Sequence, residues 1–148
     1  MSTPIRKPTD QQRCDVPGQR DPRHRLGRLG EDLAAAHLER LGFAVLERNR
    51  RTPCGEIDLV ASDGEVIVFA EVKTRRAPRR AGGARPHEEP LSWLRARQRA
   101  RLRRAATVWL AERDRPRTPA AAVRFDAIGV IVDGRGRLLG LEHLEGAW

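Results

Sequence analysis

Two apolar runs separated by a turn signal constrain the fold of this chain more than any other feature. Residues 57–61 (IDLVA) and 66–73 (VIVFAEVK) are rich in β-branched residues and flank an Asp-Gly pair at 63–64. Asp-Gly between two such runs is a strong signal for a β-hairpin. A two-residue turn at this pair places Ser62 opposite Glu65, and this register assigns every side chain of the hairpin to one face or the other.

One face of this hairpin is expected to be wholly apolar, and the other to be charged at its open end. The apolar face carries Ile57, Leu59, Ala61, Val66, Val68, Ala70 and Val72. The other face has apolar residues near the turn and then Glu56, Asp58, Glu71 and Lys73. The register puts Glu56 directly opposite Glu71, with Asp58 on the diagonal, roughly 5–8 Å away by Cβ geometry.

Three carboxylates that converge in this way need compensating positive charge, because opposed like charges destabilise a sheet. Lys73 supplies one positive charge. A divalent cation would supply the rest, and ligands that are all oxygen favour Mg²⁺ or Mn²⁺ over zinc. The alternative is that the carboxylates are sheet-end charges in water, paired with arginines. The set of Asp58, Glu71 and Lys73 beside a strongly basic segment favours the metal site.

The positive charge of the chain is concentrated directly after this hairpin. The net charge is +9, yet residues 73–104 contain twelve basic and only two acidic residues. Within the helix expected there, the arginines lack acidic partners four residues away, which favours a phosphate backbone as the partner over a solvated helix face. The candidate nucleic-acid contacts are Arg75, Arg76, Arg79, Arg80, Arg97, Arg101 and Arg104.

Lys73 is unusual in this chain, in which 27 of the 29 cations are arginine. The other lysine, Lys7, lies in the N-terminal 22 residues. We therefore interpret position 73 as one where a compact, rotatable ammonium group is required and a planar guanidinium does not serve.

Patterning along the chain predicts one α/β domain at 23–148 after a disordered tail at 1–22, which has almost no apolar residues. A helix is expected from Leu26 to Gly42 and another from Leu91 to about Arg113, with a basic loop at 74–90. The expected strands are 43–48, 57–61, 66–73, 123–132 and 138–144. The order α-β-β-β-α-β-β suggests a mixed sheet flanked by helices.

Composition excludes several other classes of protein. No stretch approaches the ~20 apolar residues of a membrane span, and the N-terminus lacks the apolar core of a secretion signal. Cys14 and Cys54 form neither a disulfide framework nor a zinc motif. We expect a cytoplasmic protein that binds nucleic acid and no membrane. Few aromatic residues are available for base stacking, which favours duplex or branched DNA over single strands. Whether two copies form a homodimer is left open.

Two stretches of the hairpin resemble a known family. GEIDLV at 55–60 and FAEVKTR at 69–75 are similar to the signature of the YraN-like family of uncharacterised bacterial proteins. Further agreement comes from Gly30-Glu31 with Ala34 and Ala35, from Arg124-Phe125-Asp126 and from the C-terminal LEGAW. The resemblance covers about residues 25 to 148 in collinear order.

The resemblance implies the restriction-endonuclease-like fold, which type II restriction enzymes share with archaeal Holliday-junction resolvases. In that superfamily an Asp on one strand and an (Asp/Glu)-x-Lys on the next form a metal-dependent nuclease centre. Asp58 matches the first element, and Glu71 with Lys73 matches the second. Glu31 matches the helix-borne acid that some resolvases add. Gln98 either matches a helix-borne Gln of related nucleases or is a packed, satisfied Gln on the apolar stripe of its helix.

The expected function is therefore that of a nuclease, dependent on Mg²⁺ or Mn²⁺, that hydrolyses phosphodiester bonds in structured DNA. Asp58 and Glu71, joined by Glu31, are expected to hold the metal. Lys73 is expected to orient the attacking water or to neutralise charge on the phosphorane, with Glu56 and Gln98 in supporting positions. The alternative is a non-catalytic nucleic-acid-binding protein that retains the nuclease fold.

Overall fold

The computed structural model describes residues 21–77, 95–112 and 122–148. These residues form two helices and one five-stranded sheet, whose strands lie side by side in the order β1-β2-β3-β4-β5. Neighbouring strands are antiparallel except β3 and β4, which are parallel. The predicted mixed α/β fold and its order α-β-β-β-α-β-β are confirmed. The elements are α1 (Pro22–Arg40), β1 (Ala44–Thr52), β2 (Gly55–Ser62), β3 (Val66–Arg76), α2 (Ala96–Ala111), β4 (Ala122–Val132) and β5 (Leu138–Leu144).

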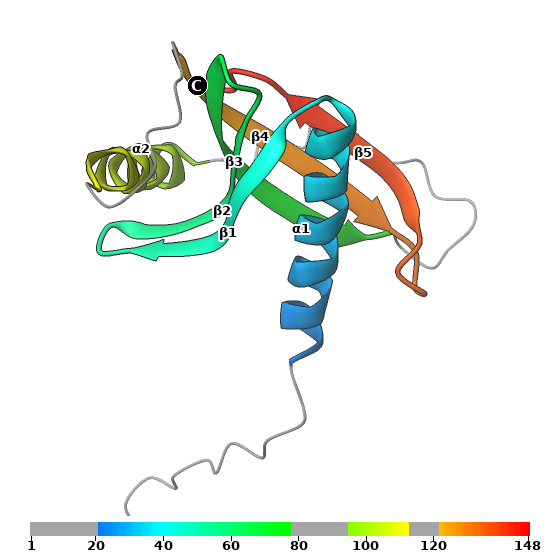
Figure 1. Ribbon diagram of the computed structural model, residues 1–148. Helices are drawn as coiled ribbons and strands as arrows, with labels where there is room; N and C mark the ends of the chain where they lie inside the picture. Colours follow the sequence, from blue (N-terminus) through cyan, green and yellow to red (C-terminus); the bar gives the residue numbers. More distant parts are fainter. Residues whose placement is uncertain (1–20, 78–94, 113–121) are drawn as a thin grey trace, which may run out of the picture.

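The two helices pack on opposite faces of the sheet, because alternate residues of β3 point into two separate cores. Val68 and Ala70 pack with Leu38 of α1, whereas Phe69 packs with Trp109 of α2. The rings of Phe69 and Trp109 meet edge to face with centroids 5.4 Å apart. Figure 1 shows α1 crossing the sheet, with α2 beside the β1–β2 end. Both helices contact β1, β2 and β3, so this part of the sheet is covered on both faces.

The first helix begins four residues earlier than the sequence pattern predicts. The Asp21 side chain accepts a 2.9 Å hydrogen bond from the backbone N–H of Arg23, and Pro22 occupies the first turn. Both are favourable at a helix start. The predicted tail at 1–22 otherwise lies outside the described residues. At the other end Gly42, with φ of +94°, allows the chain to leave the helix as expected.

The turn between β2 and β3 differs from the prediction. Ser62 pairs with Ile67 rather than with Glu65, so the predicted two-residue turn is wrong by two positions. The longer turn is stabilised by side chains, because the Asp63 carboxylate accepts hydrogen bonds from the backbone N–H groups of Glu65 and Val66. The length of the turn remains even, and most side chains therefore keep the faces that were assigned to them.

Ile57 is the exception to this assignment. It is fully buried in the core under α2, together with Val60 and Leu102, rather than on the face of Leu59. The strict alternation of β2 therefore breaks between Ile57 and Leu59. This break surrounds Asp58, so it bears directly on the candidate site.

Buried polar contacts tie the C-terminal residues to the sheet. Asp126 on β4 is fully buried and accepts hydrogen bonds from the Arg124 guanidinium, at 2.8 and 2.9 Å, and from the Gly146 backbone N–H at 3.0 Å. The His143 ring nitrogen Nε2 lies 2.9 Å from the same carboxylate, and its Nδ1 lies 3.1 Å from Nε2 of His37 on α1. The ion pair between Arg124 and Asp126 is thus the centre of a larger network.

The remaining boundaries are close to the prediction where they can be compared. β1 extends to Thr52 instead of ending at residue 48, and β3 includes the first residues of the predicted basic loop. Residues 78–90 of that loop, including Arg79 and Arg80, lie outside the described residues, as do 91–94 and 113 of the predicted second helix. Neither described helix has the length and apolar character required to cross a membrane.

Candidate active site

The candidate site lies where β2 separates from β3. Pairing between these strands ends at Leu59 and Ala70, although β3 continues to pair with β4 along its whole length. The Asp58 side chain bridges the gap, since its Oδ2 accepts a 2.8 Å hydrogen bond from the backbone N–H of Val72. Continuing the register puts Asp58, not Glu56, across from Glu71. The prediction that Glu56 opposes Glu71 directly is therefore wrong, because it followed from the shorter turn.

Asp58 is surrounded by other carboxylates. Burial, followed by the negative charges of Glu71, Glu31 and Glu56, raises its pKa to about 7, against the lowering effect of the hydrogen bond from Val72. We call Asp58, Glu71, Glu31 and Glu56 the carboxylate cluster. Such an accumulation of negative charge costs folding free energy and attracts cations.

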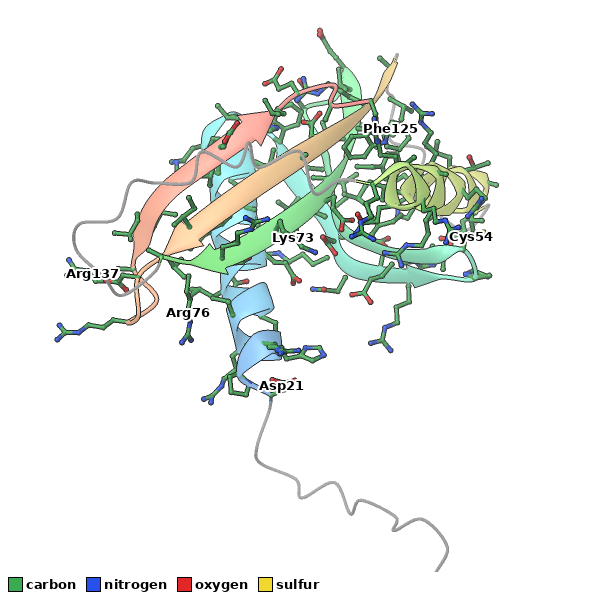
Figure 2. The ribbon with its side chains drawn as sticks, turned by 180° about the vertical axis from the view of Figure 1, so that it is seen from behind. Asp21, Cys54, Lys73, Arg76, Phe125 and Arg137 are labelled. Atoms are coloured by element: carbon green, nitrogen blue, oxygen red, sulfur yellow. The ribbon has the colours of Figure 1, made fainter. Side chains whose placement is uncertain are left out.

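Glu71 lies in the same environment but closer to positive charge. Burial raises its pKa, the cations Lys73 and Arg101 lower it, and Glu56 raises it again. Lys73 follows two residues later on β3, so the alternation of the strand puts it on the same face as Glu71. Figure 2 marks the position of Lys73 on β3. The predicted trio of Asp58, Glu71 and Lys73 is therefore brought into one neighbourhood.

Arg101 approaches this neighbourhood from α2 because residue 55 has no side chain. A Cβ at Gly55 would lie only 2.8 Å from Cγ and Cδ of Arg101, and Gly55 also has φ of +135°. A glycine is required on both grounds. The sequence indicated Arg101 as a nucleic-acid contact, and the structure also places its charge where it lowers the pKa of Glu71.

A second glycine brings Glu31 to the cluster. A Cβ at Gly30 would lie 1.6 Å from Oγ1 of Thr74 on β3, so α1 crosses β3 at a separation that only glycine permits. The Oε2 atom of the neighbouring Glu31 accepts a 2.8 Å hydrogen bond from Nδ2 of Asn49. The helix-borne acid that the resemblance implied therefore lies close enough to Asp58 to raise its pKa.

Asn49 is a residue of the site that the sequence analysis missed. Arg48 pairs with Leu59 and Arg50 pairs with Ile57, so Asn49 lies across from Asp58. Its φ of +51° is uncommon for a residue with a side chain, and asparagine tolerates it better than most. The sequence pattern offered no signal for it, because the predicted first strand ended at residue 48 whereas β1 continues to Thr52.

The two supporting residues have local partners. Glu56 forms an ion pair with Arg51 of β1 at 3.5 Å, and it remains close enough to Asp58 to raise its pKa. Gln98 accepts a 3.1 Å hydrogen bond at Oε1 from the backbone N–H of Arg95, at the start of α2. The Gln98 side chain therefore satisfies a backbone N–H at the start of this helix.

The described part of the chain contains no ready-made metal site, in the sense of three His, Cys, Asp or Glu side chains grouped closely enough to hold an ion. The donor chemistry nevertheless fits Mg²⁺ or Mn²⁺, since the cluster offers only carboxylate oxygens. Asp58 is held by a single backbone N–H, and Glu31 by a single amide.

The predicted basic contacts that the structure describes are all exposed. Arg75 and Arg76 lie at the end of β3, and Arg97, Arg101 and Arg104 lie on α2. Of these five arginines, Arg101 is close enough to the carboxylate cluster to lower the pKa of Glu71.

A pocket of about 620 Å³ borders the cluster on the side of α1, and Glu31, Asn49 and Glu56 form one of its walls. We call it the α1 pocket. A second pocket, of about 570 Å³, is lined by α1 and its N-cap residue alone and does not include any residue of the cluster.

Comparison with known proteins gives a consistent family assignment. The model of the uncharacterised protein family UPF0102 matches residues 30–130. A UPF0102 protein from Streptomyces griseus is 46% identical over 121 residues, which is 82% of this chain and 93% of that protein. A UPF0102 protein from Moorella thermoacetica is 40% identical over 126 residues, covering 85% of this chain and 97% of its own length. One from a Parafrankia strain is 44% identical over 124 residues, with 84% and 96% covered. The resemblance to the YraN-like family is thereby confirmed, and the chain belongs to the UPF0102 family of uncharacterised proteins.

Proposed function

We propose that this protein is a Mg²⁺-dependent nuclease that hydrolyses phosphodiester bonds in duplex or branched DNA. The observation that carries the proposal is the environment of Asp58, a buried carboxylate whose pKa is raised to about 7 by burial and by three neighbouring carboxylates. A strongly perturbed group beside a specific set of charges is typical of functional sites. Lys73, two residues from Glu71 on the same strand, adds the cation that phosphoryl chemistry requires.

In this proposal each residue of the site has its own role. Asp58 and Glu71 hold the ion, with Glu31 reaching them from α1 and Glu56 adding negative potential. A bound divalent ion would polarise the scissile phosphate and lower the pKa of an attacking water. The Lys73 ammonium orients that water or neutralises the charge that accumulates on the phosphate oxygens.

The DNA part of the proposal is supported by the exposed arginines around the cluster. Arg97 and Arg104 on α2 are exposed and have no acidic partner within the described residues. A phosphate backbone neutralises such a surface and releases counterions, so binding should weaken steeply as salt is raised.

The test is to incubate labelled duplex, branched and single-stranded DNA with the protein in Mg²⁺, Mn²⁺ or EDTA. Asp58→Ala is compared with Glu142→Gln, which removes an exposed carboxylate of β5 that is not a member of the cluster. We expect cleavage by the wild type and Glu142→Gln in the presence of metal, and none by Asp58→Ala. Cleavage that persists in EDTA, or that Asp58→Ala retains, would overturn the proposal.

A non-catalytic nucleic-acid-binding role is the second candidate, and one observation favours it. Within the described ranges no three potential ligands are grouped for a metal ion. The same experiment separates the candidates, because this role gives salt-sensitive binding without cleavage under every metal condition.

A further inference from the structure

The N-terminal half of α1 carries a cationic surface that the charge distribution along the sequence did not indicate. Arg23, His24 and Arg28 line the α1 pocket, together with Arg51 from β1. The lining also includes Glu31 of α1, Asn49 of β1 and Glu56 of β2. One pocket therefore joins a group of cations to the edge of the carboxylate cluster.

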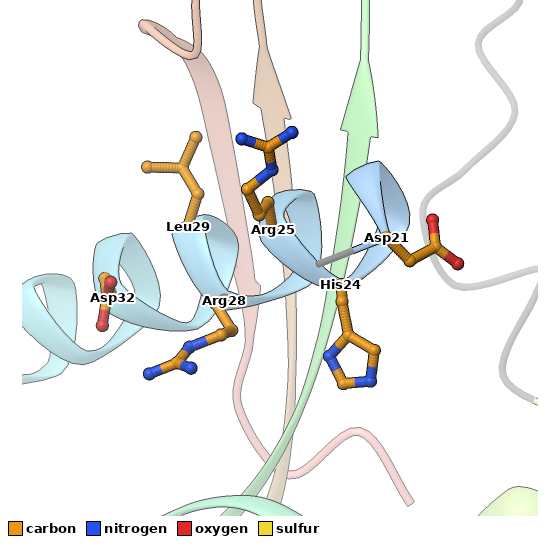
Figure 3. Close-up of a pocket in the computed structure, with 6 residues that line it drawn as sticks. All are labelled: Asp21, His24, Arg25, Arg28, Leu29 and Asp32. Atoms are coloured by element: carbon orange, nitrogen blue, oxygen red, sulfur yellow. The ribbon is translucent and has the colours of Figure 1, made fainter. Parts of the chain in front are cut away.

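Helical periodicity arranges the α1 residues as a row. Residues three, four and seven positions apart lie on one face of a helix, so His24, Arg28 and Glu31 follow one another along α1. Figure 3 shows His24 and Arg28 projecting to one side of α1, while Arg25 and Leu29 project to the other. The side of α1 that carries His24 and Arg28 is thus the one that faces the α1 pocket.

The length of this row suits a polymer rather than a single small anion. His24 and Glu31 are seven residues apart, about 10 Å along the helix axis. At 3.4 Å of axial rise per nucleotide, this distance corresponds to about three nucleotides of one strand. An isolated phosphate would also meet the negative charge of Glu31 and Glu56 in the same pocket, whereas a strand places phosphates along the whole row.

The cationic side chains of this pocket differ in whether they already form an ion pair. Arg51 forms its ion pair with Glu56, and Glu31 is held by Asn49. In the portion of the chain that the structure describes, neither Arg23 nor Arg28 forms an ion pair through its guanidinium. These two groups present hydrogen-bond donors in the geometry that suits phosphate oxygens.

We propose that the α1 pocket binds the phosphodiester backbone of nucleic acid, with Arg23 and Arg28 contacting phosphates of the strand that reaches the carboxylate cluster. Arg97 and Arg104 on α2 contact the backbone elsewhere. This inference rests on the proposed function only in that the ligand is DNA, and it does not require cleavage.

The test is equilibrium binding of a fluorescently labelled DNA duplex in EDTA at a series of salt concentrations. Arg23→Gln/Arg28→Gln is compared with Arg25→Gln/Arg40→Gln, which removes the same charge from α1 outside the pocket. We expect the pocket variant to lose about tenfold or more in affinity at low salt. The slope of its logarithmic salt dependence should fall by about 0.9 for each phosphate that the variant no longer binds. The control variant should stay within roughly twofold of the wild type, since neither Arg25 nor Arg40 lines the α1 pocket.

Three outcomes would overturn this inference, and the first two of them leave the proposed function standing. Equal losses of DNA affinity in the two α1 variants would show that binding depends only on net charge. If Arg97→Gln/Arg104→Gln loses affinity for DNA and the pocket variant does not, the protein binds DNA without using the α1 pocket. A wild type that binds anionic phospholipid vesicles but no DNA at low salt would overturn both proposals. Circular dichroism melting of each variant confirms that it is folded.

Discussion

Asp58 lowers the stability of the folded protein and is central to the chemistry that we propose. Its carboxylate is buried beside three others, and its contact with the backbone N–H of Val72 only partly compensates that environment. Residues that are unfavourable for stability and central to a site are common in enzymes. Asparagine at this position keeps an oxygen that accepts the hydrogen bond and removes the negative charge.

We therefore predict that Asp58→Asn is more stable than the wild type at pH 8 in EDTA, by about 1–3 kcal/mol. Thermal or urea unfolding measures the difference. Adding Mg²⁺ should stabilise the wild type and have no effect on the variant. The exposed Glu142→Gln is the control and should match the wild type in both conditions. An Asp58→Asn protein that is less stable than the wild type in EDTA would show that the carboxylate cluster is not a source of strain.

Lys73→Arg tests whether a compact ammonium group is required. Arginine keeps the positive charge but is planar and longer, so it should not reproduce the position of the Lys73 nitrogen. We expect the variant to lose most of its cleavage activity, about 10²-fold or more, while DNA binding in EDTA stays near that of the wild type. Both are measured on the same substrate. Unchanged activity would remove Lys73 from the catalytic group.

Much of the candidate site could be predicted from single residues and their spacing. The parity of the hairpin and the resemblance together indicated Asp58, Glu71 and Glu31, and the structure places all three in one electrostatic neighbourhood. Asn49 and the packing of Gly55 against Arg101 were not predicted. Both depend on contacts between elements far apart in sequence, and neither a strand pattern nor a motif records such contacts.

The crossing of α1 over β3 is the contact between elements that positions Glu31. We predict that Gly30→Ala destabilises the protein by about 1–3 kcal/mol or more, because its Cβ would overlap Thr74. Gly27→Ala is the matched control in the same helix, since no atom lies within 4 Å of a Cβ there. It should be stabilising by about 0.5–1 kcal/mol. Urea unfolding of both variants measures these values, and equal stabilities would contradict the close approach of α1 and β3.

The order and type of the elements could be predicted from hydrophobic patterning, but their register could not. An Asp-Gly pair favours a two-residue turn, and the Asp63 carboxylate instead stabilises a longer one by accepting two backbone N–H groups. Ile57 changed faces because it fills the core under α2 next to Leu102. Local turn signals do not include this tertiary packing.

At the scale of the whole molecule, the Asp126 network joins α1, β4, β5 and the C-terminal residues. Burial disfavours the charged form of Asp126, but hydrogen bonds from His143, Arg124 and the Gly146 backbone outweigh it and hold the pKa of this carboxyl below its usual value. A group whose pKa is lowered on folding stabilises the protein above its unfolded pKa, about 3.9 for Asp. That contribution is lost as the pH falls through the lower, folded value.

Asp126→Asn should consequently lower the stability at pH 7 by about 2–4 kcal/mol, because it leaves the partly buried Arg124 without its full partner. Between pH 5 and pH 2 the stability of the variant should change less steeply than that of the wild type. Urea unfolding across this pH range measures both effects. A variant whose acid transition is as steep as that of the wild type would show that Asp126 is not the group that titrates.

The distribution of charge over the whole molecule is broader than the sequence indicated. The basic segment at 73–104 contributes positive charge. The arginines of α1 contribute more, although they lie far from that segment in the sequence. The carboxylate cluster lies near both, beside the point where β2 leaves β3. A folded chain therefore surrounds an acidic site with cations from α1, β3 and α2.

The most direct test of this account is whether the carboxylate cluster binds a divalent ion, because that measurement requires no choice of substrate. Mn²⁺ binding is followed by electron paramagnetic resonance on the wild type, Asp58→Asn, Glu71→Gln and the control Glu142→Gln. We predict saturable binding by the wild type and the control, weakened at least about tenfold in the two cluster variants. Equal binding by all four proteins, or no saturable binding by the wild type at millimolar Mn²⁺, would contradict the assignment of a metal-dependent site.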